Sequence, residues 1–255
     1  MRIPRLSENM APVAFGIFVI LAWSFIVNLF GVPSYVFPSP YEIMLSALKH
    51  EGVLRQASVI TFAEAASGLL IGFFIATIVA ILSSQIAVVR KALAPYLVVL
   101  QTTPVPAVAP LFVLWFGEGS WSRIMASFAI CVVPMAISIT NGLLVEDGGR
   151  VELYKVVGHG RMWRFLNVTA PLAFPSVLTA LQFGAMLSVV GAVVGELVTA
   201  DAGIGYVVIQ ASYSLDTPLL FSAICCAAII GFTMYSIISI MAGIVGLERF
   251  YLSER

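Results

Sequence analysis

The sequence predicts an all-α membrane protein with about six transmembrane helices, and three observations support this fold class: its composition, its long apolar runs and the placement of its basic residues. Of the 255 residues, 60% are hydrophobic and only 10% are charged, and the mean hydropathy is +1.04. In soluble domains, roughly a quarter of the residues are charged and about half are apolar. The chain is too apolar for one water-soluble core, which excludes a soluble enzyme, a secreted disulfide scaffold and a disordered chain.

Six runs of the sequence are long and apolar enough to cross a bilayer, whose hydrocarbon core of about 30 Å requires about 20 helical residues. They lie near residues 11–32, 57–87, 93–116, 123–145, 172–199 and 217–247. Because the runs are continuously apolar rather than alternating, they predict helices and not barrel strands. The first run is too long for the apolar core of a signal peptide, so we expect it to be a span.

The basic residues predict that both termini are cytoplasmic. Cytoplasmic loops of membrane proteins are enriched in Lys and Arg. With six spans and a cytoplasmic N-terminus, only Lys49, Arg55 and Arg123 of the 13 basic residues lie on the outer side. Since 13 acidic residues balance the 13 basic ones, no basic patch can dominate, and nucleic acid is not expected as a partner.

The segment 146–170 is the longest stretch between spans that is too polar for lipid, and this topology places it in the cytoplasm. We expect two short helical pieces, near 151–157 and 161–168, separated by Gly158-His159-Gly160. Glycines there permit a sharp break in the backbone. The segment is either a basic topology anchor or a docking surface for a partner protein.

Two spans carry stripes of small residues that predict close helix packing. In the second span, Gly68, Gly72, Ala76 and Ala80 recur at intervals of four. In the fifth span the same interval joins Gly184, Ser188, Ala192, Glu196 and Ala200, and Gly191 and Gly195 form a second close-packing pair. Glu196 therefore faces a helix or a cavity, because a charge exposed at the bilayer centre costs about 2.5–3.5 kcal/mol. It either lines a transport path or makes an interhelical hydrogen bond near the outer interface. Glu64 is expected to be an interfacial residue.

Three prolines, Pro104, Pro106 and Pro110, interrupt the third span. Each removes a backbone donor and clashes with the preceding turn, which predicts a kinked or broken helix. Broken helices are tolerated in membranes only where protein or a water-filled cavity satisfies the freed backbone groups. Transporters use such places for binding and movement, so the break favours a transporter over a passive anchor.

The sequence contains no motif for catalysis or metal binding. No Gly-Lys pair occurs, so a phosphate-binding P-loop is absent, and Leu54 stands where a zinc-protease helix starting at His50-Glu51 would need a second histidine. The cysteines Cys131, Cys225 and Cys226 lie inside apolar runs without metal-ligand spacing. We therefore predict no catalytic residue, no metal site and no enzyme activity in this chain.

One ordered motif lies in the segment 146–170 and just beyond it. Glu152-Leu153-Tyr154-Lys155-Val156-Val157-Gly158 is followed by Arg161, Phe165, Val168, Pro171 and Pro175. This pattern resembles the EAA loop of bacterial ABC-importer permeases, in which a Glu-Ala-Ala helix precedes a glycine and a later Leu-Pro. Here Leu153 and Tyr154 replace the alanines and Ala170 replaces the leucine, so the contact surface must differ in detail.

Further motifs follow in order along the chain. They are Phe37-Pro38-Ser39-Pro40, Pro104 to Leu111 with Leu114-Trp115-Phe116-Gly117, Gly195-Glu196-Leu197, Gly203-Ile204-Gly205-Tyr206 and Glu248-Arg249. Together they resemble the nitrate/sulfonate/taurine-type permeases, which include transporters of pyrimidine precursors of thiamine and of riboflavin-like compounds. The resemblance covers roughly residues 35–250, and Gln101-Thr102-Thr103-Pro104 is similar to the pyrimidine-precursor branch.

The resemblance implies the MetI-like permease fold of type I ABC importers, with residues 1–255 as a single permease domain in a bacterial inner membrane. It implies that two permease copies, expected to be identical, form a path for a small solute along their interface. Two copies of a separate ATPase subunit would bind ATP and Mg²⁺, so no cofactor is expected in this chain. An extracytoplasmic solute-binding protein would deliver the solute to the outer face, including 33–56 and 200–216.

The resemblance also implies roles for individual residues. At the ATPase contact we expect Glu152, Tyr154, Lys155, Gly158 and His159, with Arg161 and Arg164 adding charge and Pro171 ending the coupling element. Candidate residues of the translocation path are Gln101, Thr102, Pro104, Gln182, Ser188 and Glu196. For the polar ones, an ordinary interhelical hydrogen bond is the alternative.

Two other function classes stay open at this point. An ion-coupled secondary transporter would use Glu196 and Glu64 to carry protons and would need no ATPase. A membrane scaffold without a transport role would give no reason for the proline break or for a polar group on the interhelical stripe.

Overall fold

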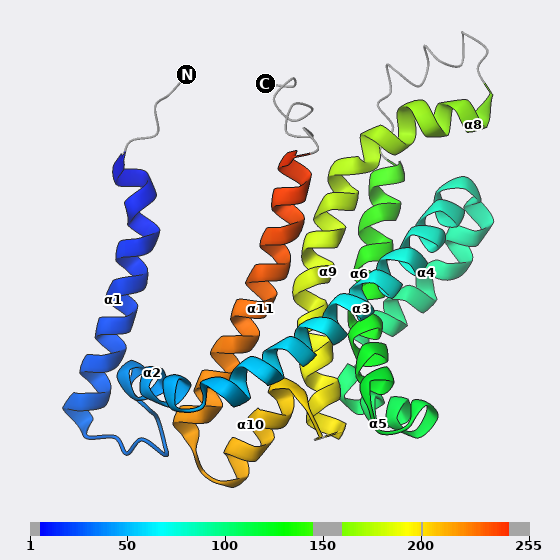
Figure 1. Ribbon diagram of the computed structural model, residues 1–255. Coiled ribbons are helices and arrows are strands. Elements are labelled where there is room, and N and C mark those ends of the chain that lie inside the picture. The colour runs from blue at the N-terminus through cyan, green and yellow to red at the C-terminus, as the bar shows by residue number, and fades with distance from the viewer. Residues whose placement is uncertain (1–5, 145–159, 200, 245–255) are drawn as a thin grey trace.

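The computed structural model describes residues 6–144, 160–199 and 201–244, and within these ranges every regular element is a helix (Figure 1). The elements are α1 (Leu6–Phe30), α2 (Pro40–Lys49), α3 (Glu51–Gln85), α4 (Ala87–Thr102), α5 (Val105–Phe116), α6 (Ser120–Leu144), α8 (Arg161–Arg164), the π-helical η1 (Phe165–Thr169), α9 (Ala170–Thr199), α10 (Gly203–Tyr213) and α11 (Thr217–Ile244). The all-α fold class is therefore confirmed.

Five helical stretches of the described residues are long and apolar enough to cross a membrane. They are Val13–Phe30, Glu51–Gln85, Ser120–Leu144, Met162–Thr199 and Thr217–Gly243. The pair α4 and α5 passes the same test together but is bent by 97°, which makes up to six spans. Each of the six predicted apolar runs thus corresponds to a helix or, in the third case, to a bent pair.

The bend between α4 and α5 lies at Thr103 and Pro104, where the prolines predict a break. Thr103 follows the last residue of α4, and Pro104 is the N-cap residue of α5 in an extended conformation. Pro106 occupies the first turn of α5, where the missing N–H costs no hydrogen bond. The prolines therefore end one helix and start the next, and the predicted break is confirmed.

The core of the bundle is formed by α3, α6 and α9, which pack through the predicted stripes of small residues. Eight of the nine stripe residues, from Gly68 to Ala80 and from Gly184 to Glu196, are buried, and Ala200 lies outside the described residues. A Cβ atom at Gly191 would lie 2.5 Å from Cα of Ser127, and one at Gly195 would lie 2.8 Å from Cα of Arg123. Glycine at these two positions allows the backbones of α6 and α9 to approach closely.

Two short helices, α2 and α10, lie within segments 33–56 and 200–216, for which no helix was predicted from the sequence. A capping box starts α2: the Glu42 side chain accepts from the Ser39 backbone N–H at 2.7 Å, and the Glu42 N–H donates to Ser39 Oγ at 3.3 Å. Pro40 fills the first turn of the same helix. This start signal is readable in the sequence, whereas α10 has no side-chain cap of its own.

The start of α9 is irregular because Pro171 lacks an N–H group. Without that donor the usual i to i−4 bond to the Asn167 carbonyl is lost. The N–H of Ala170 instead donates to the Phe165 carbonyl, five residues back, in the π-helical turn η1. The helical piece expected near 161–168 is confirmed as α8 and η1, and the piece expected near 151–157 lies outside the described residues.

The helix ends gather at two opposite ends of the bundle (Figure 1). The N-terminal end of α1, the C-terminal end of α11 and the short α8 lie at one end, drawn at the top. The opposite end carries α2, α5 and α10. This arrangement fits an even number of crossings, and which end faces the cytoplasm stays a prediction.

Candidate functional site

A cavity of about 530 Å³ lies beside the break between α4 and α5. The break contributes Leu100, Gln101, Thr103, Val105 and Pro106; α6 contributes Ala129, Ile130, Val133, Pro134 and Ser138; and α9 contributes Ala180, Phe183, Leu187, Val190 and Val194. No charged side chain belongs to this lining, and its polar side chains are Gln101, Thr103 and Ser138. We call this space the break cavity.

The three polar side chains of the break cavity differ in how much of their hydrogen-bonding capacity other residues of the chain already use. Thr103 Oγ1 donates to the Val99 carbonyl at 2.8 Å, and Ser138 Oγ donates to the Ser176 carbonyl at 3.2 Å. Gln101 is exposed and has no hydrogen-bond partner in the described part of the chain. The two hydroxyl oxygens can therefore still accept, while the Gln101 amide can both donate and accept.

The structure brings only part of the predicted translocation path together. Gln101 lines the break cavity, and Thr102 and Pro104 are exposed at the break itself. Gln182 Nε2 donates to Ser239 Oγ at 2.9 Å and so joins α9 to α11. Ser188 and Glu196 are fully buried and line none of the cavities described here. The path assignment of all six residues stays a prediction.

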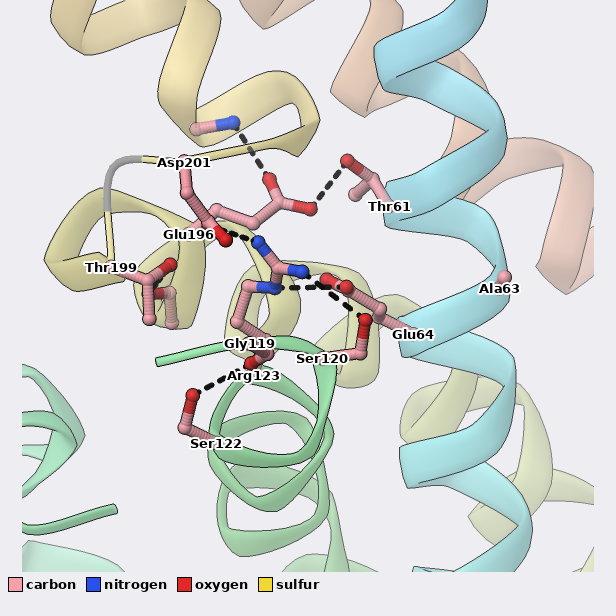
Figure 2. Close-up of polar contacts among 12 residues, drawn as sticks. Thr61, Ala63, Glu64, Gly119, Ser120, Ser122, Arg123, Glu196, Thr199 and Asp201 are labelled. Atoms are coloured by element: carbon pink, nitrogen blue, oxygen red, sulfur yellow. Dashed lines mark hydrogen bonds and ion pairs between the residues drawn. The ribbon is translucent and has the colours of Figure 1, made fainter. Parts of the chain in front are cut away.

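Glu196 caps the N-terminus of α10 (Figure 2). Its carboxylate accepts from the Gly205 N–H at 2.7 Å and from Thr61 Oγ1 of α3 at 2.6 Å. Thr61 Oγ1 in turn accepts from the Ile204 N–H at 2.9 Å. Gly203 has φ +87°, and a Cβ there would overlap the Glu196 carboxylate. This is the geometry of an interhelical hydrogen bond that satisfies otherwise unpaired helix N–H groups.

An ion-pair cluster in which Arg123 and Glu64 are buried and Asp201 is exposed adjoins this cap (Figure 2). Arg123 Nε of α6 lies 2.8 Å from Glu64 Oε1 of α3, Arg123 Nη1 pairs with Asp201, and Arg123 Nη2 donates to Ser120 Oγ at 3.2 Å. Arg123 and Glu64 are each 3% exposed. Glu64 is thus a buried partner of α6, and its expected position near the outer membrane boundary stays a prediction. The sequence signal for this pair was that Glu64 and Arg123 are each an isolated charge in a predicted apolar run.

The predicted ATPase-coupling residues fall largely outside the described residues. Glu152, Tyr154, Lys155, Gly158 and His159 all lie there. Arg161 opens α8, Arg164 closes it with a partly exposed side chain, and Pro171 stands in the first turn of α9. The coupling role of these eight residues stays a prediction.

In residues 6–144, 160–199 and 201–244, no group of three or more His, Cys, Asp or Glu side chains is placed to hold a metal ion.

Comparison with known proteins places the chain in a family. Residues 68–247 match the family model described as "Binding-protein-dependent transport system inner membrane component". A probable ABC transporter permease protein of Haemophilus influenzae is 33% identical over 217 residues, which cover 85% of this chain and 89% of that protein.

Two further relatives have a named solute. The formylaminopyrimidine transport permease ThiX of Halalkalibacterium halodurans is 28% identical, with 94% of this chain and 96% of that protein covered. The riboflavin transport system permease RibX of Chloroflexus aurantiacus is 33% identical, with 91% and 85% covered.

The solved structures support the fold. An inward-facing MetNI methionine ABC transporter chain matches with a TM-score of 0.55 and 18% identity, over 73% of this chain and 93% of that chain. At 18% identity this similarity supports only the fold, which is that of a type I importer permease. The chain therefore belongs to the binding-protein-dependent transport system inner membrane components and is a multi-pass ABC-importer permease of the sulfonate/taurine type.

Proposed function

We propose that the chain forms the translocation pathway of an ABC importer for a small solute and is driven by a separate ATPase subunit. The observation that carries this proposal is the helix break at Thr103 and Pro104 with the break cavity beside it. Irregular backbone at membrane depth is tolerated only where protein or water satisfies it. A break beside a cavity with an unengaged amide is therefore suited to a solute path.

A second copy of the chain would complete the pathway. Gln101, Thr102 and Pro104 are exposed at the break, and lipid cannot satisfy the backbone groups that a break frees. A second protein surface that encloses a water-filled path at this face would satisfy them, and permeases of the resembled family pair with a second, usually identical, copy. We propose a homodimer whose interface runs along α4 and α5.

The segment 146–170 is proposed as the contact with the ATPase. It connects α6 to α9, two helices in close backbone contact through Gly191 and Gly195. A displacement of this segment would therefore move α6 and α9 together, and both reach the break cavity. ATP and Mg²⁺ would be bound by the ATPase, and this chain would hold no cofactor.

The solute is proposed to be a small molecule of the kind that the relatives transport. Their names include formylaminopyrimidine and riboflavin, and also aliphatic sulfonates and taurine. A solute-binding protein would deliver it at the end that carries α2 and α10, where Asp201 and Asp216 lie in the connections that flank α10. That end would face outward, and both termini would be cytoplasmic.

An ion-coupled secondary transporter has less support. Glu196 would be its proton carrier, but its two carboxylate oxygens are engaged by Thr61 and Gly205 and its side chain is fully buried. Glu64 is held by Arg123 in the same way. Family membership also favours an ATP-driven importer.

Co-purification from native membranes in mild detergent tests the proposal. Mass spectrometry should recover a P-loop ATPase at matching stoichiometry with the wild-type chain, and Gly158→Leu should lower ATP-dependent uptake while the chain still inserts. Asn28→Ala, an exposed change on α1, serves as the matched control. Recovery of the chain alone, folded and still transporting, would overturn the proposal in favour of ion coupling.

A further inference from the structure

We infer that the break cavity is a solute subsite for an uncharged ring compound with amide-like donors and acceptors, and that it rejects free organic anions. This inference rests on the proposed function and narrows its solute class. The family's relatives carry both kinds of solute, since aliphatic sulfonates are anions whereas riboflavin is uncharged. The lining of the cavity distinguishes between them.

The first argument is the charge of the cavity. None of its lining residues is charged. An anion that leaves water for such a site loses several kcal/mol of hydration unless a cation pairs with it, on the order of the penalty for one buried ion. A sulfonate inside the break cavity would therefore need Lys, Arg or a protonated His nearby.

The described part of the chain offers no such cation. Arg123 is the one basic residue there that is buried, and Glu64 and Asp201 already occupy its guanidinium. The other basic residues whose side chains are described stand close to helix ends and outside the cavity lining: Lys49, Arg55, Arg90, Lys91 and Arg164. None of these residues can therefore form an ion pair with an anion in the break cavity.

The second argument is the hydrogen-bonding pattern. Gln101 presents a free amide, and the Thr103 and Ser138 hydroxyl oxygens can each still accept. An amide or aminopyrimidine edge, with neighbouring donors and acceptors, complements this set. Phe183 lines the same space and is 57% exposed, so its ring can stack on a flat solute.

The third argument is size and location. Ligand pockets of about 300–1,000 Å³ are mostly apolar with a few well-placed polar groups, and the break cavity, at about 530 Å³, fits this description. The cavity on the α3 side of the break, about 410 Å³, has only Tyr96 and Thr103 as polar lining. Gln101 therefore distinguishes the break cavity from its neighbour.

The test is equilibrium dialysis of the full-length chain, purified with whatever subunits accompany it and reconstituted in lipid nanodiscs without ATP or a binding protein. The probes are radiolabelled riboflavin and formylaminopyrimidine, both uncharged, and ethanesulfonate, an anion. We expect at least one uncharged probe to bind about tenfold or more tightly than ethanesulfonate. Gln101→Ala should weaken that binding about tenfold, because it removes one hydrogen bond to the bound solute.

Two variants sharpen the result. Asn28→Ala removes a side-chain amide of the same chemistry from exposed α1 and should leave binding unchanged. Gln101→Lys supplies the missing cation and should raise ethanesulfonate binding while lowering that of the uncharged probe. A gain for the anion cannot come from a general loss of structure.

Three outcomes would overturn the inference: ethanesulfonate binding as tightly as the uncharged probes, neither uncharged probe binding, or Gln101→Ala behaving like Asn28→Ala. The proposed function fails separately. If uncharged probes bind as expected but no ATPase accompanies the chain, the solute subsite stands and the ATP-driven mechanism does not. If the ATPase is present and the anion binds best, the ATP-driven mechanism stands and the solute subsite for an uncharged compound does not.

Discussion

The guanidinium of Arg123 in α6 lies 2.8 Å from the carboxylate of Glu64 in α3, and each side chain is 4% exposed. Neither charge could remain in this apolar setting alone, because an isolated buried ion loses its hydration without compensation. Asp201, which follows α9, pairs with the same guanidinium. One arginine thus joins three parts of the chain at the end of the bundle where α10 docks.

Arg123→Ala should destabilise the purified chain by about 3–5 kcal/mol, because it leaves the Glu64 carboxylate buried without its partner. The midpoint of chemical denaturation in detergent measures this loss. Lys91→Ala, an exposed change near the start of α4, is the control and should have little effect. The double variant Glu64→Leu with Arg123→Leu should be less damaging than Arg123→Ala; equal or greater damage would contradict the ion-pair explanation.

Gly203→Ala should detach the start of α10, since a Cβ at φ +87° is strained and would meet the Glu196 carboxylate. The backbone strain alone costs on the order of 1–3 kcal/mol. Hydrogen exchange should accelerate at the amides of Ile204 and Gly205, whose partners are Thr61 and Glu196. Gly243→Ala has open space around it and should leave these rates unchanged. Slow exchange in both variants would argue against the cap.

Pro171→Ala should allow the π-helical turn at Phe165–Thr169 to return to an α-helix, because the missing N–H donor is restored. The direction of α8 relative to α9 would then change. On the proposed coupling, uptake should fall while the ATPase subunit still co-purifies. Pro95→Ala, inside α4, is the proline control. Unchanged uptake in Pro171→Ala would show that the turn is not needed for coupling.

Cysteine labelling tests the proposed orientation of the bundle. Met162 in α8 and Tyr213 in α10 are 70% and 87% exposed, and these two helices lie at opposite ends of the bundle (Figure 1). In a background with Cys131, Cys225 and Cys226 replaced by Ala, Tyr213→Cys should react with a membrane-impermeant maleimide in intact cells. Met162→Cys should react only after the inner membrane is permeabilised. The opposite pattern would invert the topology, and with it the position of segment 146–170.

Local sequence patterns predict the elements whose cause is local. Hydropathy indicates the six apolar runs, and prolines indicate the break at Thr103 and Pro104. The start of α2 is also readable in Ser39 and Glu42, although no helix was predicted there. Intervals of four in α3 and α9 correctly indicate which faces are buried.

Long-range contacts are what the sequence could not predict. The cap of α10 comes from Glu196 and from Thr61, which is 143 residues away from its backbone partner. The pairing of Arg123 with Glu64 depends on the relative heights of α3 and α6 and not on any spacing in the chain. For the same reason, Gln101 was a candidate from its polarity, but its neighbours Ser138 and Phe183 in the break cavity appear only in the folded bundle.

The first helix stands apart from the others (Figure 1). Among its described side chains only Val27 is buried. Trp23 contacts the rings of Phe37 and Phe221, with ring centroids 5.3 and 6.0 Å apart, and so attaches α1 to the rest of the chain. Lipid tails are as apolar as its surface, so wider helix–helix contact would add little. Replacement of α1 should therefore be tolerated: an unrelated apolar helix of equal length that keeps the Trp23 ring should fold in its place. This makes α1 a suitable point for fusing a reporter or exchanging a membrane anchor.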